Sequence, residues 1–429
     1  MSQHIPEGDT ATNGLFYIYE IGKQKLRADV LLNSIYIKPG GEYQHNAVNW
    51  SSRSLTNIPS VRYAAISFDP VGSYNDSLLD CSVRITRKKL HAFSISPEVT
   101  NNGGRLGFGA STNYNNRNIF KGGESLQLTA SGSFELQFGS TETQVGNLLH
   151  TAQAGITTTL FFPRILLPFG WGNMPGYNLP RTNIDLGFSY QKRADLYDRI
   201  ISNVAMGYSW RSNNSKLSHY FSPIDFNYVS IDKEPILENY ISQMKGSLYE
   251  RQYTSHTLLG MRYSLVVSNQ SDKKKKGVHH YFRVNAEASG NFLNLMSTTF
   301  NQERDSLGLY NFLGSPYSQF VMGDLEYRLY HYFTPDNVIV FRFATGIGFP
   351  YGNSVALPVE KAFYGGGAND MRGWGLKLLG PGSYQSDLLI ERVADVAIKA
   401  NVEYRFPIYK FIRLAAFLDV GNVWLWNAD

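Results

Sequence analysis

Three charged residues near the end of the chain are of the right types to form a buried ion-pair cluster. Arg372 lies in the glycine-rich segment Phe363–Trp374, which reads Phe-Tyr-Gly-Gly-Gly-Ala-Asn-Asp-Met-Arg-Gly-Trp. If this loop enters the protein interior, the guanidinium requires carboxylate partners, because an unpaired buried charge is costly. Glu403 and Asp419 lie on the polar faces of predicted strands and should point inward. The alternative is that Arg372 lies at the tip of an exposed loop and that both acids are ordinary interior lining.

The sequence carries no recognisable motif for catalysis or for nucleotide binding. It contains no Gly-x-Ser-x-Gly elbow and no His-Glu-x-x-His pair. His279 and His280 are adjacent and would point to opposite faces of a strand. The glycine-rich segment Gly346–Gly352 ends a predicted strand and is not followed by a helix, which argues against a phosphate site. We therefore predict that the protein is not an enzyme and that it has no cofactor and no metal.

The composition favours strands that cross a membrane. Charged residues make up 17% of the chain, below the roughly 25% of soluble proteins, whereas aromatic residues reach 14%. No stretch approaches the roughly 18 consecutive apolar residues of a membrane-spanning helix. A membrane protein without such helices must be a closed barrel, because only then are all backbone groups paired in lipid. The net charge of +5 is scattered, and we interpret the basic run Lys273–Lys276 as a turn, so we predict no nucleic-acid partner.

After Lys89, every periodic segment alternates apolar and polar residues, and most segments are ten or more residues long. Between Asp395 and Phe406, Lys399 and Glu403 lie on one face and Ile398 lies on the other. Such alternation also occurs in soluble sandwiches, but the strand length and the aromatic strand ends favour a membrane barrel. Thirteen strands are predicted, near residues 91–100, 105–118, 125–138, 147–162, 181–193, 200–211, 217–231, 254–268, 279–293, 318–333, 337–349, 395–408 and 411–424. Because bacterial barrels have even strand numbers, an odd number indicates a miscount or an incomplete barrel.

The first 89 residues follow a different, mixed pattern. Residues 1–13 are polar and are predicted to be a loop or a cut end, since they lack the features of a signal peptide. Residues 14–89 predict a small unit of two helices and two strands that lacks its first strand, unless Phe16–Glu20 supplies it. Its helices are predicted over Lys23–Ile35 and over His45–Ile58, the second with Val48, Ser51, Ser52 and Leu55 facing inward, and its strands over Arg62–Phe68 and Leu78–Arg87.

The only cysteine, Cys81, excludes an internal disulfide and any metal site built from several cysteines. It shares the apolar register of the second strand with Leu79, Val83 and Ile85. We therefore predict a buried thiol in the core of the unit.

Several motifs together resemble the BamA/TamA superfamily of outer-membrane assembly factors. The segment Phe363–Trp374 is similar to the conserved sixth loop of that family, in which a Gly-Gly element leads to Arg-Gly-aromatic. Val402–Pro407 resembles its glutamate-bearing strand, and Phe417–Trp424 resembles its Phe-x-Asp-x-Gly-x-x-Trp strand. Gly107–Glu124 resembles the second strand and the turn after it, and Ile37–Tyr43 with its flanking helices resembles a POTRA module. The family motif residues are Gly365, Gly366, Gly367, Gly373 and Trp374 in the loop, and Phe417, Gly421 and Trp424 in the strand.

The resemblance implies a mainly β fold: a transmembrane antiparallel β-barrel of a sixteen-stranded family, with about thirteen strands present, preceded by a small α+β POTRA module. Residues 14–89 would be the POTRA-like periplasmic module, and residues 90–429 would be the barrel without its last strands. It further implies that the sixth loop folds into the lumen, where Arg372, Glu403 and Asp419 form a latch. The aromatic-rich style is most similar to the TamA-like branch of Bacteroidetes.

The function implied is insertion of outer-membrane proteins or translocation of surface proteins. The POTRA module would receive unfolded clients, and insertion would exploit weak pairing of the first and last strands. Pro97 in the first strand fits a weakened edge, although it could equally mark a strand end. The implied partners are outer-membrane lipid and lipopolysaccharide, unfolded client proteins, and periplasmic or inner-membrane subunits. The alternatives are a passive or substrate-specific pore and, less favoured without a nucleophile motif, a surface enzyme.

Overall fold

The structure is a computed structural model. It describes residues 9–13, 16–20, 26–71, 78–102, 105–137, 149–167, 175–194, 196–212, 216–243, 253–270, 276–383, 392–409 and 411–426. Most of the turn predicted at Lys273–Lys276 lies outside these residues.

Thirteen antiparallel strands form one sheet, in the order β19-β18-β17-β16-β13-β12-β11-β10-β9-β8-β7-β6-β5. The thirteen predicted strands are confirmed to within a few residues at most ends. Their bounds are β5 His91–Asn102, β6 Arg105–Asn116, β7 Ser125–Gln137, β8 Leu149–Phe162, β9 Arg181–Arg193, β10 Tyr197–Arg211, β11 Leu217–Lys233, β12 His256–Ser268, β13 Gly277–Ser289, β16 Phe320–Thr334, β17 Asn337–Pro350, β18 Val396–Tyr409 and β19 Ile412–Trp424.

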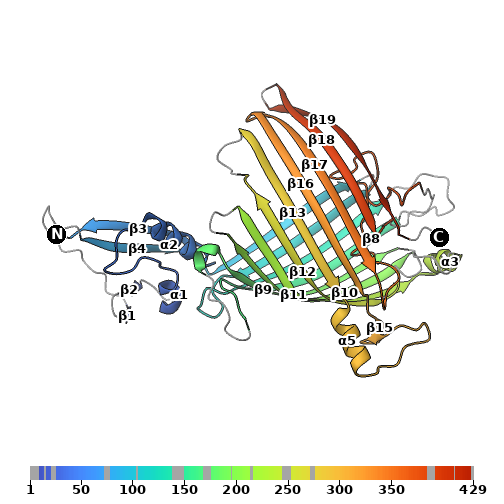
Figure 1. The fold of residues 1–429 in the computed structure, drawn as a ribbon, viewed down its shortest axis with the longest axis horizontal. Helices are drawn as coiled ribbons and strands as arrows, with labels where there is room; N and C mark the ends of the chain where they lie inside the picture. Colours follow the sequence, from blue (N-terminus) through green and yellow to red (C-terminus); the bar gives the residue numbers. More distant parts are fainter. Residues whose placement is uncertain are drawn as a thin grey trace.

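The sheet is curled, and Figure 1 shows β16–β19 crossing in front of the strands near β8. Among the described residues β5 and β19 are its two edges and do not pair with each other, so the sheet is not closed, which agrees with the prediction of a barrel that lacks its last strands. The strand register separates polar from apolar side chains. Arg342 lies opposite Asn401, whereas the neighbouring Phe343 lies opposite Ala400. We call the charged side the inner face and the apolar side the outer face.

Long connections leave the sheet at the end remote from the amino terminus. They carry α3 (Pro235–Gln243), α5 (Asn291–Thr299) with the two-residue strands β14 (Asn311–Phe312) and β15 (Ser315–Pro316), and the loop 351–395. The strand predicted over 279–293 is wrong in its last residues, because β13 ends at Ser289. Gly290 follows with φ +77, and a Cβ there would meet the Ser318 carbonyl oxygen at 2.5 Å. No helix in the described part of the chain is both long and apolar enough to span a membrane.

A small unit precedes the sheet. It contains α1 (Ala28–Leu32), α2 (His45–Asn57), β3 (Val61–Pro70) and β4 (Leu79–Arg87), with β3 and β4 paired. The second predicted helix is confirmed, whereas the first is much shorter than predicted. Its core contains Leu26, Leu55, Ile58, Val61 and Ala64. The inward face of α2 consists of Ala47, Ser51, Ser54 and Leu55, so Val48 and Ser52 were wrongly predicted to face inward.

Two further sequence predictions about this region are wrong. Cys81 is exposed. Among the odd-numbered residues of β4, only Val83 and Ile85 pack against the core, whereas Cys81 lies opposite Phe68 near the far end of the hairpin. The segment predicted to be a loop or cut end contains β1 (Asp9–Asn13), which pairs with β2 (Phe16–Glu20). Backbone pairing therefore gives this polar segment order that its composition does not predict.

The small unit is docked against the near end of the sheet. Trp50 of α2 stacks on Tyr177, which lies in the short helix η1 (Gly176–Asn178) between β8 and β9, with ring centroids 4.5 Å apart. Asn57 accepts a hydrogen bond of 3.0 Å from Arg181 at the start of β9. The Arg27 backbone donates to the Lys121 carbonyl between β6 and β7 at 2.9 Å. Three contacts to two segments, one between β6 and β7 and one at the start of β9, thus hold the unit at this end.

Candidate functional site: a loop fixed against the inner face

The loop 351–395 between β17 and β18 folds back onto the inner face of the sheet. Its described residues include a buried apolar cluster that packs against inward-facing side chains of β12 and β16. Burying these side chains removes apolar area from water and fixes the base of the loop. The cluster consists of Leu357, Val359, Ala362 and Val393 from the loop with Leu258 and Phe320 from the strands.

Arg372 ties the loop to the last two strands of the sheet. Its Nε and Nη2 donate to the two carboxylate oxygens of Asp419 on β19, at 2.9 and 2.7 Å. Its Nη1 donates to Glu403 on β18 at 2.6 Å. The Asp419 side chain is only 6% exposed, so the pairing compensates a carboxylate removed from water. The structure thus brings together the three residues that were predicted to meet.

Phe417 also contacts the Arg372 side chain. The guanidinium carbon lies 3.6 Å from the centroid of the Phe417 ring, which is within the range of a cation–π contact. Phe417 and Asp419 are two residues apart on β19, so both side chains lie on the inner face. The hydrogen bonds from Arg372 to Asp419, and then the single bond to Glu403, raise the pKa of Arg372, so it stays positively charged.

Asp370 provides a second contact two residues earlier, which the sequence analysis did not identify. Its carboxylate accepts hydrogen bonds from Lys399 Nζ at 2.8 Å and from the Gly366 backbone at 3.1 Å. Its other oxygen lies 3.3 Å from Arg342. The strand register had placed Lys399 on the polar face, but nothing in the sequence identified its partner in the loop.

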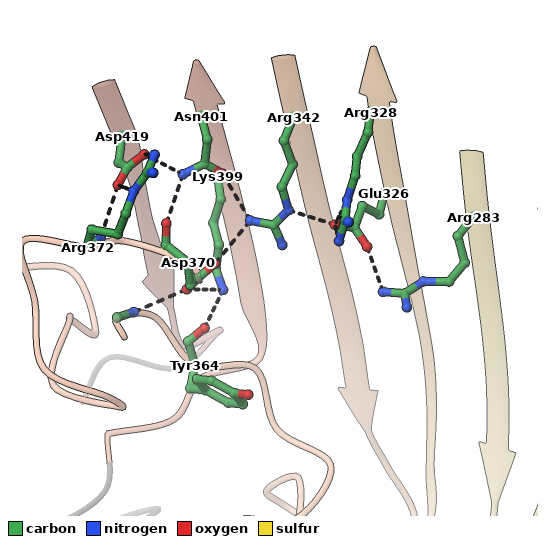
Figure 2. Close-up of polar contacts among 11 residues, drawn as sticks. Arg283, Glu326, Arg328, Arg342, Tyr364, Asp370, Arg372, Lys399, Asn401 and Asp419 are labelled. Atoms are coloured by element: carbon green, nitrogen blue, oxygen red, sulfur yellow. Dashed lines mark hydrogen bonds and ion pairs between the residues drawn. The ribbon is translucent and has the colours of Figure 1, made fainter. Parts of the chain in front are cut away.

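A chain of charges continues along the inner face, as Figure 2 shows. Arg342 donates to Glu326 at 2.6 Å, and Glu326 also pairs with Arg283 at 2.9 Å and with Arg328 at 2.7 Å. Glu326 is 3% exposed, so three arginines surround one buried carboxylate. Asn401 joins the two halves of the network, since it donates to Asp419 and accepts from Arg342.

The motif glycines differ in what the structure requires of them. Gly366 and Gly367 have φ values of +103 and +100, which L side chains rarely adopt, and a Cβ on Gly365 would meet the Leu379 side chain at 2.8 Å. A Cβ on Gly421 would lie 2.6 Å from the Ile398 carbonyl oxygen, because β18 and β19 approach closely there. Gly373 has open space around it and no positive φ.

The two motif tryptophans form backbone hydrogen bonds at the tip and at the base of the loop. The Trp374 carbonyl oxygen accepts a hydrogen bond from the Gly367 backbone at 2.9 Å and so closes the loop tip, while its side chain is largely exposed. The Trp424 carbonyl oxygen accepts from the Asp395 backbone at 3.0 Å, where the loop joins β18. Both residues therefore contribute to the loop through backbone bonds.

The loop is also tied to strands on the other side of β16. Glu360 pairs with Arg199 of β10 at 2.9 Å and lies 3.4 Å from His256 of β12. Lys361 pairs with Glu287 of β13 at 2.5 Å. Although burial raises the pKa of Glu360, the neighbouring His256 side chain and the charge of Arg199 lower it to about 2. The loop therefore connects two separate groups of strands across the inner face.

The described residues include no group of three or more histidine, cysteine, aspartate or glutamate side chains that could hold a metal ion. The charged residues on the inner face bond to one another and to the loop, so their arrangement can fix a segment in place.

Comparison with solved structures gives matches to BamA and to CdiB. BamA from Haemophilus ducreyi lacking POTRA domains 1–3 matches with a TM-score of 0.60 at 12% identity, over 95% of this chain and 74% of that one. CdiB from Escherichia coli matches with a TM-score of 0.51 at 10% identity, over 94% of this chain and 65% of that one. At these identities the matches show the fold alone. No curated protein matches the chain in sequence.

The sequence model of the Omp85 superfamily domain matches residues 95–427. This range covers most of the chain and contains nearly all of the sheet, the loop 351–395 and all three residues of the Arg372 cluster. The chain therefore belongs to the Omp85 superfamily.

Proposed function

We propose that this protein lies in the bacterial outer membrane and inserts outer-membrane proteins or translocates surface proteins, with the loop 351–395 latched in the barrel lumen. The observation that carries the proposal is the pairing of Arg372 with both Glu403 and Asp419. A passive pore needs an open channel, whereas this loop is held against the inner face by apolar packing and by two sets of ion pairs. The position of the loop against the inner face suits a protein that binds polypeptides along the sheet.

The small unit, which forms most of the module predicted over residues 14–89, fits the role of a POTRA-like periplasmic module. It is docked at the sheet end opposite the loop 351–395, through Trp50, Asn57 and Arg27. It would receive unfolded clients and pass them to the strands, and periplasmic or inner-membrane subunits would bind it. Outer-membrane lipid and lipopolysaccharide would contact the apolar outer face. Assignment to the TamA-like branch stays a prediction.

Depletion of the protein in its native host tests this function. We expect outer-membrane proteins to lose their heat-modifiable, folded form or surface proteins to lose protease accessibility on whole cells. Complementation with the Arg372→Ala variant should fail to correct the defect. Arg413→Ala is the matched control, because Arg413 forms an exposed pair with Asp336 at the opposite end of the sheet. Unimpaired assembly and surface display after depletion, with solute-selective conductance in bilayers, would instead establish a pore.

A further inference from the structure

The connection between β13 and β16 carries a short helix with an apolar face exposed on the surface. In α5 the exposed apolar side chains are Phe292, Leu295 and Met296, and Phe300 follows directly at its end. Spacings of three and four residues place these side chains on one side of a helix. Phe300 is 74% exposed. A soluble protein normally turns such a face toward its own core.

The opposite side of α5 is fixed to the protein, so the apolar face cannot turn inward. Leu293 and Ser297 are buried. Asn294 accepts a hydrogen bond from the Tyr317 hydroxyl at 3.3 Å, and Asn291 accepts one from the Tyr351 hydroxyl at 2.6 Å. The helix therefore presents its large apolar side chains outward in one defined orientation.

The rest of the connection adds apolar groups at two turns. Leu307 precedes Gly308, and Leu313 precedes Gly314; both glycines have positive φ. Leu307 is 81% exposed and Leu313 is 66% exposed. Residues 291–302 contain no charged side chain. Six large exposed apolar side chains on one connection, around an uncharged helix, match a hydrocarbon environment better than the polar rim of a protein interface.

The position of α5 continues the outer face of the sheet. In Figure 1 the helix projects outward from the sheet beside the ends of β12 and β16, and not beyond the end of the molecule. The adjoining outer-face residues are apolar and exposed, namely Met261 on β12, Val321 on β16 and Phe349 on β17. This outer face is the side that a barrel of this family turns toward lipid.

We propose that α5 is an interfacial helix that lies in the outer leaflet of the outer membrane, with Phe292, Leu295, Met296 and Phe300 among the acyl chains. The occupant of this face is lipid, because the face is uncharged and continuous with the apolar wall of the strands. The helix fixes the depth of this side of the sheet in the bilayer. The proposal requires only that the protein lies in the membrane and holds whether it moves proteins or solutes.

Fluorescence quenching in vesicles tests the position of the helix. The test uses the full chain, in which Cys81→Ser removes the only thiol and Leu295→Cys introduces a new one. The new thiol is labelled with an environment-sensitive fluorophore, and the protein is reconstituted in phosphatidylcholine vesicles. We expect a blue-shifted emission and strong quenching when the acyl chains are brominated. Phe300→Cys should behave in the same way. Glu303→Cys, an exposed polar position on the same connection, is the matched control and should show neither effect.

Heat-modifiable migration confirms that each labelled variant is folded before the measurement. Water-like emission at position 295 without quenching by bromine would overturn the proposal and leave the face to a soluble partner. Blue-shifted emission without quenching by bromine, combined with energy transfer between labelled copies, would also overturn it and assign the face to a second copy of the chain.

Discussion

Arg372 donates three hydrogen bonds to Asp419, from Nε, from Nη2 and from its own backbone nitrogen, at 2.9, 2.7 and 3.0 Å. The backbone bond fixes the main chain of the loop, and the side-chain bonds fix the guanidinium plane. A bidentate pair of this kind is specific for arginine, because lysine offers a single point charge.

Loss of this pair should destabilise the protein. We expect Arg372→Ala to cost about 3 kcal/mol of unfolding free energy, since it leaves Asp419 buried without its partner. Arg372→Lys should recover only part of the loss. Urea unfolding of the vesicle-reconstituted protein measures both effects, with Arg413→Ala as the exposed control. A double variant, Arg372→Ala with Asp419→Ala, should be less destabilised than the sum of the single variants. Additive effects would show that the two residues do not interact.

Asp370 should control the loop tip separately from Arg372. Asp370→Asn removes the charge that pairs with Lys399 and Arg342 and weakens the acceptor for the Gly366 backbone. We expect faster proteolysis within residues 365–371, while the Arg372–Asp419 pair still holds the rest of the loop. Asp336→Asn, at an exposed turn, is the control. Unchanged cleavage would contradict a role for Asp370 in holding the tip.

Two glycines of the same motif should respond differently to alanine. Gly366→Ala forces a side chain into φ +103 and against the Gly375 carbonyl oxygen, so we expect a loss of at least about 1 kcal/mol. Gly373→Ala should change stability little, because its surroundings are open. Thermal unfolding followed by heat-modifiable migration compares the pair. Equal effects would mean that the motif tolerates alanine without regard to backbone geometry.

The ion pairs that Glu360 forms with the strands should weaken at acidic pH. Its pKa is lowered from 4.5 to about 2 in the folded protein, so its stabilising effect is complete above 4.5 and is lost as the pH falls from 4.5 toward 2. A spin label at Val355, an exposed position in the same loop, should gain mobility across this range. In the Glu360→Gln variant, the gain in spin-label mobility that comes from protonation of Glu360 should be absent. If both proteins showed the same dependence of mobility on pH, other carboxylates would be responsible for it.

The docking of the small unit should depend on its aromatic contact. Trp50→Ala removes the stack on Tyr177, which is worth about 1 kcal/mol beyond apolar burial. We expect a broader distance distribution between spin labels placed on the unit and on the sheet. Tyr43→Ala removes another aromatic pair, with Phe68, that lies within the unit, and should leave the distribution unchanged.

The alternation of apolar and polar residues predicted the sheet well, because successive side chains of a strand point to its two faces, and these faces have different environments. The thirteen strands and the inward direction of Glu403 and Asp419 follow from that rule. The rule fails where residues are no longer in a strand. The predicted tail of β13 is the helix α5, since Gly290 ends the strand and the apolar spacing changes to that of a helix. An apolar register likewise did not bury Cys81, because it lies opposite Phe68, beyond the part of β4 that packs on the core of the unit through Val83 and Ile85.

The loop contacts were only partly predictable. Arg372 was found through a family motif, whereas Asp370, Glu360 and Lys361 lie in a segment without periodicity. Their partners come from strands far away in the chain, such as Arg199 and Glu287, and only the curled sheet brings them close. Sequence indicates which strand residues face inward but not which of them a loop residue meets.

The attachment of one loop to two groups of strands acts as a cross-brace. Arg372 ties it to β18 and β19, and Glu360 and Lys361 tie it to β10, β12 and β13. While both ties hold, these two groups of strands keep a fixed separation across the inner face. Any opening of the sheet between them therefore requires one set of ion pairs to break, after which the loop moves with the group of strands to which it is still tied.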